Sequence, residues 1–312
     1  MPLSDLTLAE LNEFRPEVPE PADFDAFWAD TLAEARAVPQ QLSLAPIDGP
    51  VTQFEVEDLT FRGFGGDPVR AWVIRPQSAG RLPAVVEFVG YNGGRGLPAE
   101  HLDWASAGFV HVVMDTRGQG SGWGGGGATP DPHGSGPAFE GFMTRGIEDP
   151  RTYFYRRVFT DAVRLVEAVR TLDFVDAERV AVTGGSQGGG ITLAVAGLLG
   201  GQVVGAMPDV PFLCHFRRSV ELTPDRPFTE VTKYLSVHRD QVDAVFRTLS
   251  YFDGAVFASR ATAPALFSVG LMDQIVLPSS VFAAYHRYGA AEKELAVYEF
   301  NGHEGGDVFH WQ

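Results

Sequence analysis

The stretch Gly184-Gly185-Ser186-Gln187-Gly188-Gly189-Gly190 joins two runs of different character. Residues 179–183, before it, are typical of a buried strand, and residues 191–198, after it, have the spacing of a helix. A strand that turns so tightly into a helix forces its central residue into a strained backbone conformation, for which only small neighbours leave room. The stretch therefore predicts a nucleophile elbow, in which the hydroxyl of Ser186 is exposed at a helix N-terminus.

The glycine content of the chain offers a second interpretation of this stretch. With 36 glycines in 312 residues, a flexible glycine turn around a serine can arise by chance. The strand before it and the helix after it favour the elbow, because the elbow requires both. In an elbow the backbone N–H of Gln187 is free to donate to an oxyanion, since the first amides of a helix have no internal partner.

From residue 84 onward, strand-like and helix-like runs alternate. The apolar runs that predict central strands are 84–89, 109–114, 179–183, 203–207, 265–269 and 294–300, and the helix-like runs are 99–107, 152–172, 191–198 and 279–288. Repeated β-α units imply a mostly parallel sheet covered by helices on both faces, so the fold class is α/β. Ligands bind to such sheets at the carboxyl ends of the strands.

The N-terminal part follows a different pattern. Residues 22–38 place apolar side chains on one face of a helix, which Asp23 can cap. Two β-rich runs, 51–61 and 69–74, flank a turn-like segment. They predict an antiparallel hairpin at one edge of the sheet.

Two longer segments interrupt the alternation. Residues 115–150 are rich in glycine and proline and too long for a simple connection, so they form either a functional loop or a disordered one. Residues 211–260 carry aromatic side chains at helix-like spacing and are interpreted as a cap over the strand ends, or else as a peripheral pair of helices. Because no low-complexity linker divides the chain, we expect one domain over residues 1–312.

Composition limits the partners that the chain can have. Its 24 basic and 40 acidic residues give a net charge of −16, which disfavours nucleic acid, anionic membranes and strongly anionic substrates and favours a small neutral substrate. Cys214 is the only cysteine, which excludes an intramolecular disulfide and a cysteine-rich metal site and favours a buried, small apolar role. The N-terminus lacks a signal-peptide pattern and no apolar span reaches about 18 residues. We therefore expect a soluble, cytoplasmic protein.

A serine nucleophile needs an imidazole to accept its proton and a carboxylate to orient that imidazole. After an elbow serine, the expected chain order is the acid and then the histidine. His303 follows the strand-like run 294–300 in a glycine-rich loop, at a carboxyl end. His310 is the weaker competitor. The other candidates fall in cap or helix patterns, where a histidine ordinarily packs or is solvated: His215, His238 and His286.

Asp273 is the acid that we expect to orient His303, because it follows the strand-like run 265–269 at a carboxyl end. Asp253 and Asp209 are alternatives. Asp209 also follows a strand but comes earlier than this architecture usually places the acid. The sequence thus predicts a triad of Ser186, Asp273 and His303.

The second oxyanion donor should come from the loop after the early central strand. That loop is residues 89–96, Val-Gly-Tyr-Asn-Gly-Gly-Arg-Gly. Gly90 permits a close approach of the main chain, so the backbone N–H of Tyr91 is the candidate donor beside that of Gln187.

Three short motifs and two longer stretches carry a resemblance to a known family. The short motifs are Arg117-Gly118-Gln119, the elbow at 184–188 and His303-Glu304, and the longer stretches are 21–28 and 141–147 with 153–167. With these residues the whole chain resembles the acetyl xylan esterase and cephalosporin C deacetylase family of α/β hydrolases, carbohydrate esterase family 7. The resemblance implies an α/β-hydrolase fold with an N-terminal helix and a helical insertion or cap.

The resemblance also implies a function. It suggests removal of acetyl groups from small carbohydrate esters, such as acetylated xylo-oligosaccharides, and from cephalosporin C, with the triad and the two oxyanion donors named above. It further implies a homohexamer whose active sites face an inner cavity that favours small substrates. The residues expected to support the site are Arg117, Gly118, Gln119 and Glu304.

Two positions depart from the family pattern. Val89 stands where many relatives carry a histidine, which affects the side-chain interactions of the oxyanion loop but not the Tyr91 amide. Gly185 is smaller than its usual counterpart in the elbow.

The expected mechanism is two-step acyl transfer through an acetyl-serine, which requires no metal and no organic cofactor. A peptidase or a general short-chain carboxylesterase is the alternative, because the same triad serves each. A non-catalytic binding protein on the same scaffold is a further alternative. The presence of all three triad residues in the expected order argues against it.

Overall fold

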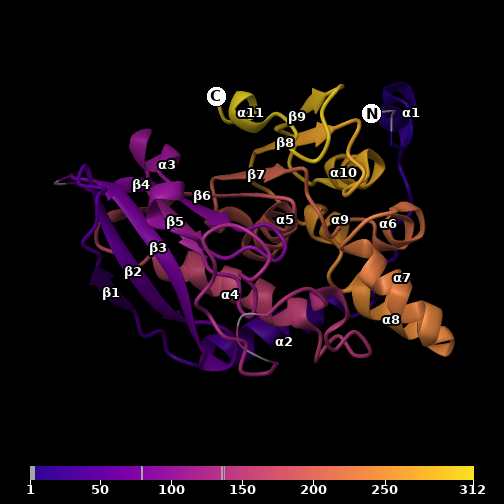
Figure 1. The fold of residues 1–312 in the computed structure, drawn as a ribbon, viewed down its shortest axis with the longest axis horizontal. Helices are drawn as coiled ribbons and strands as arrows, with labels where there is room; N and C mark the ends of the chain where they lie inside the picture. The colour runs from indigo at the N-terminus through magenta and orange to yellow at the C-terminus, as the bar shows by residue number, and fades with distance from the viewer. Residues whose placement is uncertain (1–3, 79, 135, 137) are drawn as a thin grey trace.

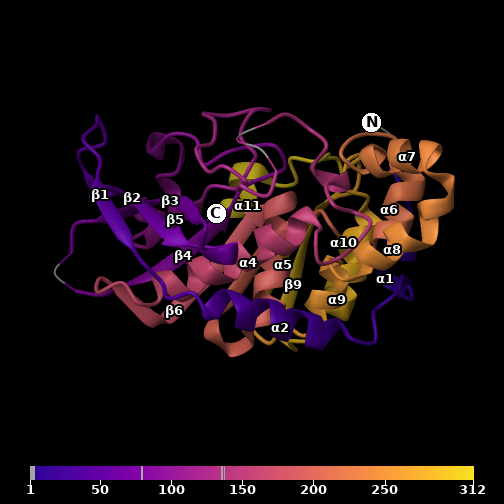
Figure 2. The ribbon, with the colours of Figure 1, turned by 90° about the horizontal axis from the view of Figure 1, so that it is seen from below.

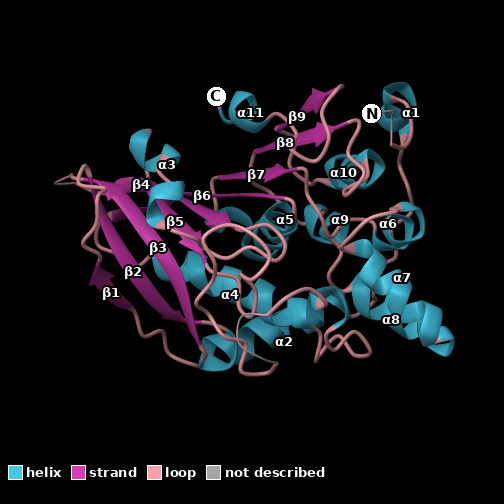
Figure 3. Ribbon diagram, viewed as in Figure 1, coloured by secondary structure: helices cyan, strands magenta, loops and turns pink. Residues whose placement is uncertain are grey.

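The computed structural model describes residues 4–78, 80–134, 136 and 138–312. Within this part of the chain, one sheet of nine strands crosses the molecule in the order β1-β2-β3-β5-β4-β6-β7-β8-β9 (Figures 1 and 3). The strands are β1 (Ser43–Pro46), β2 (Phe54–Arg62), β3 (Pro68–Pro76), β4 (Leu82–Phe88), β5 (Val110–Met114), β6 (Val175–Gly185), β7 (Gly205–Asp209), β8 (Ala265–Gly270) and β9 (Lys293–Tyr298).

Most of the sheet is parallel, as the alternating pattern predicts. From β5 through β4, β6, β7 and β8 to β9, each strand pairs in parallel with the next. β1, β2 and β3 extend the sheet beyond β5 by antiparallel pairing. The carboxyl ends of the parallel strands therefore meet along one edge of the sheet, where a ligand site is expected.

The predicted hairpin is present, but its predicted position at the edge of the sheet is wrong. β2 and β3 pair in antiparallel register from Phe54 opposite Pro76 to Arg62 opposite Pro68. The outer edge belongs to β1, which pairs with β2 and covers it. β1 has only four residues and pairs on one side, so its sequence has no apolar alternation that could have predicted it.

Helices pack against the sheet in two layers of unequal size. α4 and α5 lie against the strands, with α2 on α4 and α9 on α5 (Figure 2). The short α3 packs on β3 and β5 from the opposite side (Figure 1). The helices are α1 (Leu8–Glu13), α2 (Phe24–Arg36), α3 (Asp103–Ser106), α4 (Phe154–Val169), α5 (Gln187–Leu199), α6 (Phe216–Leu222), α7 (Phe228–Val237), α8 (Val242–Ser250), α9 (Gly254–Ala258), α10 (Pro278–Arg287) and α11 (Asp307–Trp311).

The helix predicted over residues 99–107 is much shorter in the structure. A 3-10 turn at Pro98–Glu100 is separated from α3 by His101, whose φ of −130° and ψ of 52° are not helical. Gly108 ends α3 with a φ of +96°. The apolar spacing of this region comes from the few residues that touch the sheet and not from a continuous helix.

The described residues of the 115–150 segment form a packed loop, which favours the functional loop over the disordered one. Its described residues include one 3-10 turn, Phe142–Thr144. The buried carboxylate of Asp115 accepts hydrogen bonds from the backbone amides of Arg95, Ala128 and Thr129 at 2.7–3.0 Å. These bonds fold the glycine-rich stretch back onto the loop that follows β4.

Residues 211–260 divide into two parts. α6, α7 and α8 lie together at one end of the molecule (Figures 1 and 2). α9 is fully buried and packs between α5 and α10, so it belongs to the main helical layer. Cys214 is buried in the same segment, as expected for a small apolar residue. None of the described helices is both long and apolar enough to cross a membrane.

Candidate active site

Ser186 occupies the turn between β6 and α5, with a φ of 55° and a ψ of −116°. A non-glycine residue pays of order 1–3 kcal/mol in strain for such a conformation. Two glycines make room for it: a Cβ at Gly188 would lie 2.0 Å from the carbonyl oxygen of Phe88, and one at Gly184 would lie 2.6 Å from it. Ser186 is held on both sides, because its N–H donates to Asp209 O and its carbonyl accepts from Phe212 N, each at 2.9 Å.

His303 and Asp273 are joined by a hydrogen bond of 2.7 Å between Nδ1 and Oδ2. Asp273 lies in the loop after β8 and is buried, and His303 lies in the loop after β9. The other Asp273 oxygen accepts from the backbone amides of Ile275 at 2.8 Å and Val276 at 2.9 Å. These amides fix the carboxylate, which in turn keeps one imidazole nitrogen bonded and leaves Nε2 for chemistry.

A cavity of about 650 Å³ brings Ser186 and His303 to a common surface. Its floor comes from the elbow and the loop after β4, and its rim includes Trp123 and Phe139 of the 115–150 loop and Pro227 from just before α7. A cavity of this size accommodates a small organic ligand.

Asp209, an alternative acid, lies beside the candidate triad but is not bonded to His303. It lines the same cavity and accepts a hydrogen bond from the hydroxyl of Ser268. Burial raises the pKa of Asp209 to about 6, with Asp307 and Asp273 adding to the effect and His303 opposing it. The sequence analysis considered Asp209 only as an alternative to Asp273 for the acid, and did not predict that Asp209 lies against the elbow.

Asp253, the second alternative acid, has a structural role. Its oxygens accept from the backbone amides of His215, Phe216 and Ala255 at 2.9–3.0 Å, so it connects the start of α6 with that of α9. Burial raises the pKa of Asp253 to about 6, although these amides oppose the effect. His310 lies outside the cavity and contacts the hydroxyl of Tyr298 at 3.2 Å.

The two candidate oxyanion amides flank the elbow. Tyr91 lies in the loop after β4 and lines the cavity, and Gln187 is the first residue of α5. Neither backbone N–H donates to another residue in the described part of the chain. Both amides are therefore free for a ligand.

Gln187 also acts through its side chain, which the sequence interpretation left open. Its amide pairs reciprocally with that of Gln119, at 2.9 and 3.1 Å. Its Nε2 also donates to Val89 O at 3.1 Å, and Tyr155 Oη donates to its Oε1 at 2.9 Å. Gln119 thereby ties the 115–150 loop to the elbow and to the oxyanion loop.

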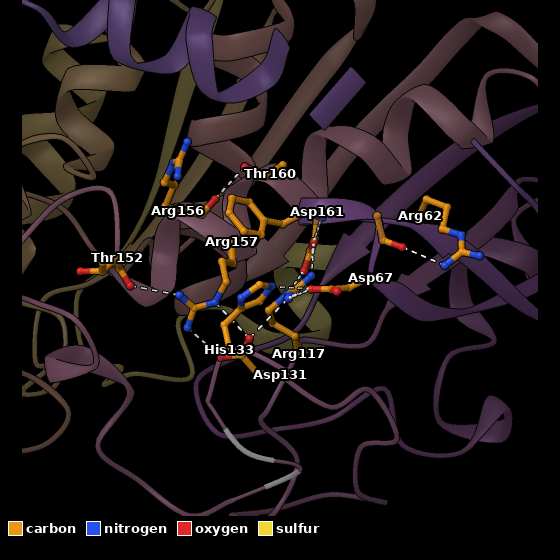
Figure 4. A network of polar contacts seen from close by, with 12 residues as sticks. Arg62, Asp67, Arg117, Asp131, His133, Thr152, Arg156, Arg157, Thr160 and Asp161 are labelled. Carbon is orange, nitrogen blue, oxygen red and sulfur yellow. Dashed lines mark hydrogen bonds and ion pairs between the residues drawn. The ribbon is translucent and has the colours of Figure 1, made fainter. Parts of the chain in front are cut away.

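Arg117 precedes Gln119 by two residues and does not line the cavity. Its guanidinium is buried and binds both oxygens of Asp161 on α4, at 2.6 and 2.9 Å, and Asp67 at 2.8 Å (Figure 4). Asp131 bridges Arg117, at 3.3 Å, and Arg157, at 2.7 Å. Burial alone would lower the pKa of Arg117, but the carboxylates outweigh it and raise the pKa. Arg117 is thus an anchor that holds the 115–150 loop against α4.

Gly118 and Glu304 also act on loops. Gly118 has a φ of +70°, and its N–H donates to Thr129 O at 2.8 Å within the 115–150 loop. Glu304 lines the cavity, and its Oε1 accepts from Asn301 Nδ2 at 3.1 Å and Gly302 N at 3.2 Å. It therefore stabilises the loop that carries His303.

The two positions that depart from the family pattern are accommodated without strain. The Val89 side chain packs in a small apolar cluster with Trp72 and Ile74 between the sheet and α3. A Cβ at Gly185 would lie 3.6 Å from Asp209 Oδ2, an ordinary van der Waals contact. The elbow thus has room for a larger residue at this position.

Sequence reasoning missed Trp123, an exposed aromatic residue on the cavity rim. Its indole N–H donates to the carbonyl of Tyr91 at 2.7 Å. A single tryptophan within a glycine-rich stretch was the signal that could have found it. Glycines let the backbone approach another segment closely, so a large aromatic side chain among them can make a contact there.

A model of the acetyl xylan esterase family matches residues 1–312 of the chain. The chain belongs to the acetyl xylan esterase family. The chain is 39% identical to the solved acetyl xylan esterase from Paenibacillus sp. R4. The two structures match with a TM-score of 0.88 over 96% of this chain and 95% of that one. Acetyl xylan esterase 1 from Thermoanaerobacterium sp. JW/SL YS485 shares 35% identity, with a TM-score of 0.89 and coverage of 98% and 96%.

A longer relative also matches. Acetyl esterase Axe7A of Xylanibacter ruminicola is 25% identical to this chain over 316 aligned residues, which cover 93% of this chain. The chain spans 65% of the length of that relative, slightly less than two thirds. Family membership and the mostly parallel sheet together establish the α/β-hydrolase fold.

Proposed function

We propose that the chain is a serine esterase that removes acetyl groups from small, neutral carbohydrate esters such as acetylated xylo-oligosaccharides, and from cephalosporin C. The observation that carries this proposal is the cavity shared by Ser186, on its strained turn, and by His303, bonded to Asp273. Membership of the acetyl xylan esterase family supports the acetyl group and the sugar as parts of the substrate.

The proposed reaction has two acyl-transfer steps. Ser186 Oγ attacks the acetyl carbonyl carbon while His303 takes the hydroxyl proton, and the amides of Tyr91 and Gln187 stabilise the oxyanion. The carbon–oxygen bond to the alcohol then breaks, and the alcohol leaves with the proton from His303. Water repeats the sequence on the acetyl-serine and releases acetate. Asp273 stabilises the imidazolium throughout.

Charge and size favour a small neutral substrate. The net charge of −16 disfavours a strongly anionic one, so it favours the neutral sugar esters over cephalosporin C, whose carboxylates are ionised. The cavity of about 650 Å³ is at the scale of an acetylated sugar or a short oligosaccharide and not of a polymer strand.

The acyl-chain profile tests the proposal. Nitrophenyl esters from acetate to octanoate and acetylated xylo-oligosaccharides are given to the wild type and to Ser186→Ala. We expect a sharp preference for acetyl that disappears in Ser186→Ala. Equal or faster turnover of long chains would establish a general carboxylesterase, and turnover of an aminopeptidase substrate would establish a peptidase. Activity that survives in Ser186→Ala would overturn the serine mechanism.

We further propose that the chain assembles as a homohexamer in the cytoplasm, with active sites facing an inner cavity. Exposed apolar side chains next to the catalytic cavity support an interface there, because such side chains gain from burial against another subunit. They include Leu97, Trp123 and Phe139. A solution mass of six subunits is expected by light scattering, and a monomer would overturn the enclosed cavity.

A further inference from the structure

The side chain of Tyr91 reaches a carboxylate far away in the chain. Its hydroxyl donates to Glu230 Oε1 at 2.6 Å, across 139 positions of sequence. Glu230 lies in the first turn of α7. The residue whose amide is a candidate oxyanion donor is therefore bonded directly to the helical segment 211–260.

Glu230 organises more than this one bond. Gly141 N donates to the same Oε1 at 3.1 Å, and Met143 N donates to Oε2 at 3.1 Å. Phe142 N, between them, donates to Tyr91 Oη at 3.0 Å. The carboxylate and the phenol thus bind three successive backbone amides, and the loop after β4, the 115–150 loop and α7 meet in one closed hydrogen-bonded ring.

The hydrogen bond between Tyr91 and Glu230 in this ring can hold the Tyr91 side chain rigidly in place. Burial and the nearby negative charge of Glu230 raise the pKa of Tyr91, so its hydroxyl stays protonated and donates at every working pH. A short hydrogen bond to an ionised acceptor is about twice as strong as one between neutral groups. The Tyr91 ring also packs edge-on against Phe142, with ring centroids 5.6 Å apart.

Other hydrogen bonds also restrain the backbone around Tyr91. Gly93 N donates at 3.2 Å to Gly90 O, the carbonyl of the peptide unit that carries the Tyr91 N–H. Trp123 Nε1 donates to the Tyr91 carbonyl at 2.7 Å, and the next amide, of Asn92, donates to Gln119 Oε1 at 2.8 Å. Trp123 is more than half exposed. The phenol–carboxylate bond is therefore the buried restraint that acts from the side of α7.

We propose that Glu230 is a positioning residue that sets the oxyanion amide of Tyr91 through the Tyr91 phenol. The inference rests on the proposed esterase function, in which that amide stabilises the oxyanion. Arg226 and Pro227 line the cavity one helical turn before Glu230. The part of the substrate that touches this rim thus contacts the same segment that aligns the oxyanion donor.

Three variants test the proposal by steady-state kinetics with nitrophenyl acetate. Tyr91→Phe removes one hydroxyl and keeps the ring, and Glu230→Ala removes the carboxylate. Each is expected to lower kcat about tenfold, less than the ~100-fold that loss of a whole oxyanion donor costs, with KM nearly unchanged. The double variant should be much less impaired than the product of the two single effects, because both changes break the same phenol–carboxylate bond and Tyr91→Phe removes only the bond from Phe142 N in addition.

Glu230→Gln and Tyr234→Phe are the controls. Glu230→Gln keeps an oxygen for Tyr91 and Gly141 and should restore most of kcat. Tyr234→Phe removes a matched phenol–carboxylate bond, from the same helix α7 to Glu148 at 3.0 Å, which does not reach the oxyanion loop. It should leave kcat at the wild-type value.

A second readout separates positioning from mere folding. A trifluoromethyl ketone adds to the serine and forms an oxyanion, so its affinity should fall by the same factor as kcat in Tyr91→Phe and Glu230→Ala. Wild-type kcat and inhibitor affinity in Tyr91→Phe would overturn the proposal, and so would an equal loss in Tyr234→Phe. A wild type without esterase activity, or an active Ser186→Ala, would instead overturn the proposed function.

Discussion

Single residues in the elbow show how local sterics govern the site. Ser186 keeps a positive φ because Gly184 and Gly188 bring the backbone of β6 and α5 close to Phe88 O. Gly185, between Gly184 and Ser186, meets no such constraint. These three glycines look alike in the sequence motif but have different physical roles.

Substitution of these glycines should separate the roles. In Gly188→Ala the new Cβ lies 2.0 Å from Phe88 O, so the free energy of unfolding should fall by about 1–3 kcal/mol. In Gly185→Ala the nearest atom is at 3.6 Å, and the same quantity should stay constant or rise by about 0.5 kcal/mol. Urea denaturation measures both. Equal destabilisation of the two variants would contradict this account.

The hydrogen bond between His303 and Asp273 leads to a kinetic prediction. In Asp273→Asn the amide cannot stabilise an imidazolium and favours the wrong tautomer of His303, so kcat for nitrophenyl acetate should fall about 10³–10⁴-fold with little change in KM. The comparison variant is Asp253→Asn. In the wild type, the Asp253 carboxylate accepts hydrogen bonds from backbone amides only. A larger loss of kcat in the comparison variant would show that Asp273 has been wrongly assigned.

Asp209 should make the stability of the protein depend on pH. Because burial raises its pKa from 3.8 to about 6, the folded state binds this proton more tightly than the unfolded state does. The free energy of unfolding therefore falls as pH rises from about 4 to 6, by roughly 2–3 kcal/mol from this group. Asp209→Asn stays neutral and should lack this part of the fall. Urea denaturation of both proteins at pH 4.5 and 7 checks it, and identical pH dependences would refute it.

At the scale of elements, the 115–150 loop is the part that assembles the site. It begins after β5, is anchored on α4 through Arg117 and Asp131, and contributes Gln119 and Trp123 to the elbow and the oxyanion loop. Its composition alone left two interpretations open, because glycine and proline are common in ordered and in disordered loops. In its described residues, the buried ion pairs of Asp131 and the hydrogen bond from Asp115 N to Arg70 O of β3 favour a packed loop.

Loss of Arg117 should therefore weaken both folding and catalysis. Arg117→Met leaves the buried carboxylates of Asp161 and Asp131 without their shared partner, which should lower the free energy of unfolding by about 3–5 kcal/mol. The contrasting variant is Glu178→Gln, which removes the exposed partner of Arg170 and should change it by less than about 1 kcal/mol. Thermal and urea unfolding compare the two. Similar effects in both variants would contradict the anchor role.

The net charge of the molecule should affect the rate at which it associates with charged substrates. With a net charge of −16, association with an anionic acetyl ester should be slowed at low salt, when the Debye length is about 30 Å at 0.01 M, and should recover at 0.1 M, when it is about 10 Å. kcat/KM for a neutral acetyl ester should not change. Rates measured for both esters across this range test the prediction, and a salt effect on the neutral ester alone would contradict it.

Features that depend on short-range geometry could be predicted from the sequence of this protein. The elbow, the alternation of strands and helices and the places of His303 and Asp273 after their strands all depend on residues close together in the chain, where backbone sterics and periodicity act. Those patterns were sufficient for the fold class and for the candidate nucleophile, base and acid. They failed where a short element such as β1 has too few residues to form a pattern.

Which distant side chains meet depends on tertiary packing and could not be predicted from the sequence. Glu230 reaches Tyr91 across 139 positions, Arg117 reaches Asp161 across 44, and Asp209 lies under an elbow that comes 23 positions before it in the chain. No local pattern marks these residues, because a carboxylate on a half-buried helix has the same sequence signature whether it faces water or a phenol. The choice follows from how the sheet, α7 and the 115–150 loop pack, and that packing depends on the whole chain.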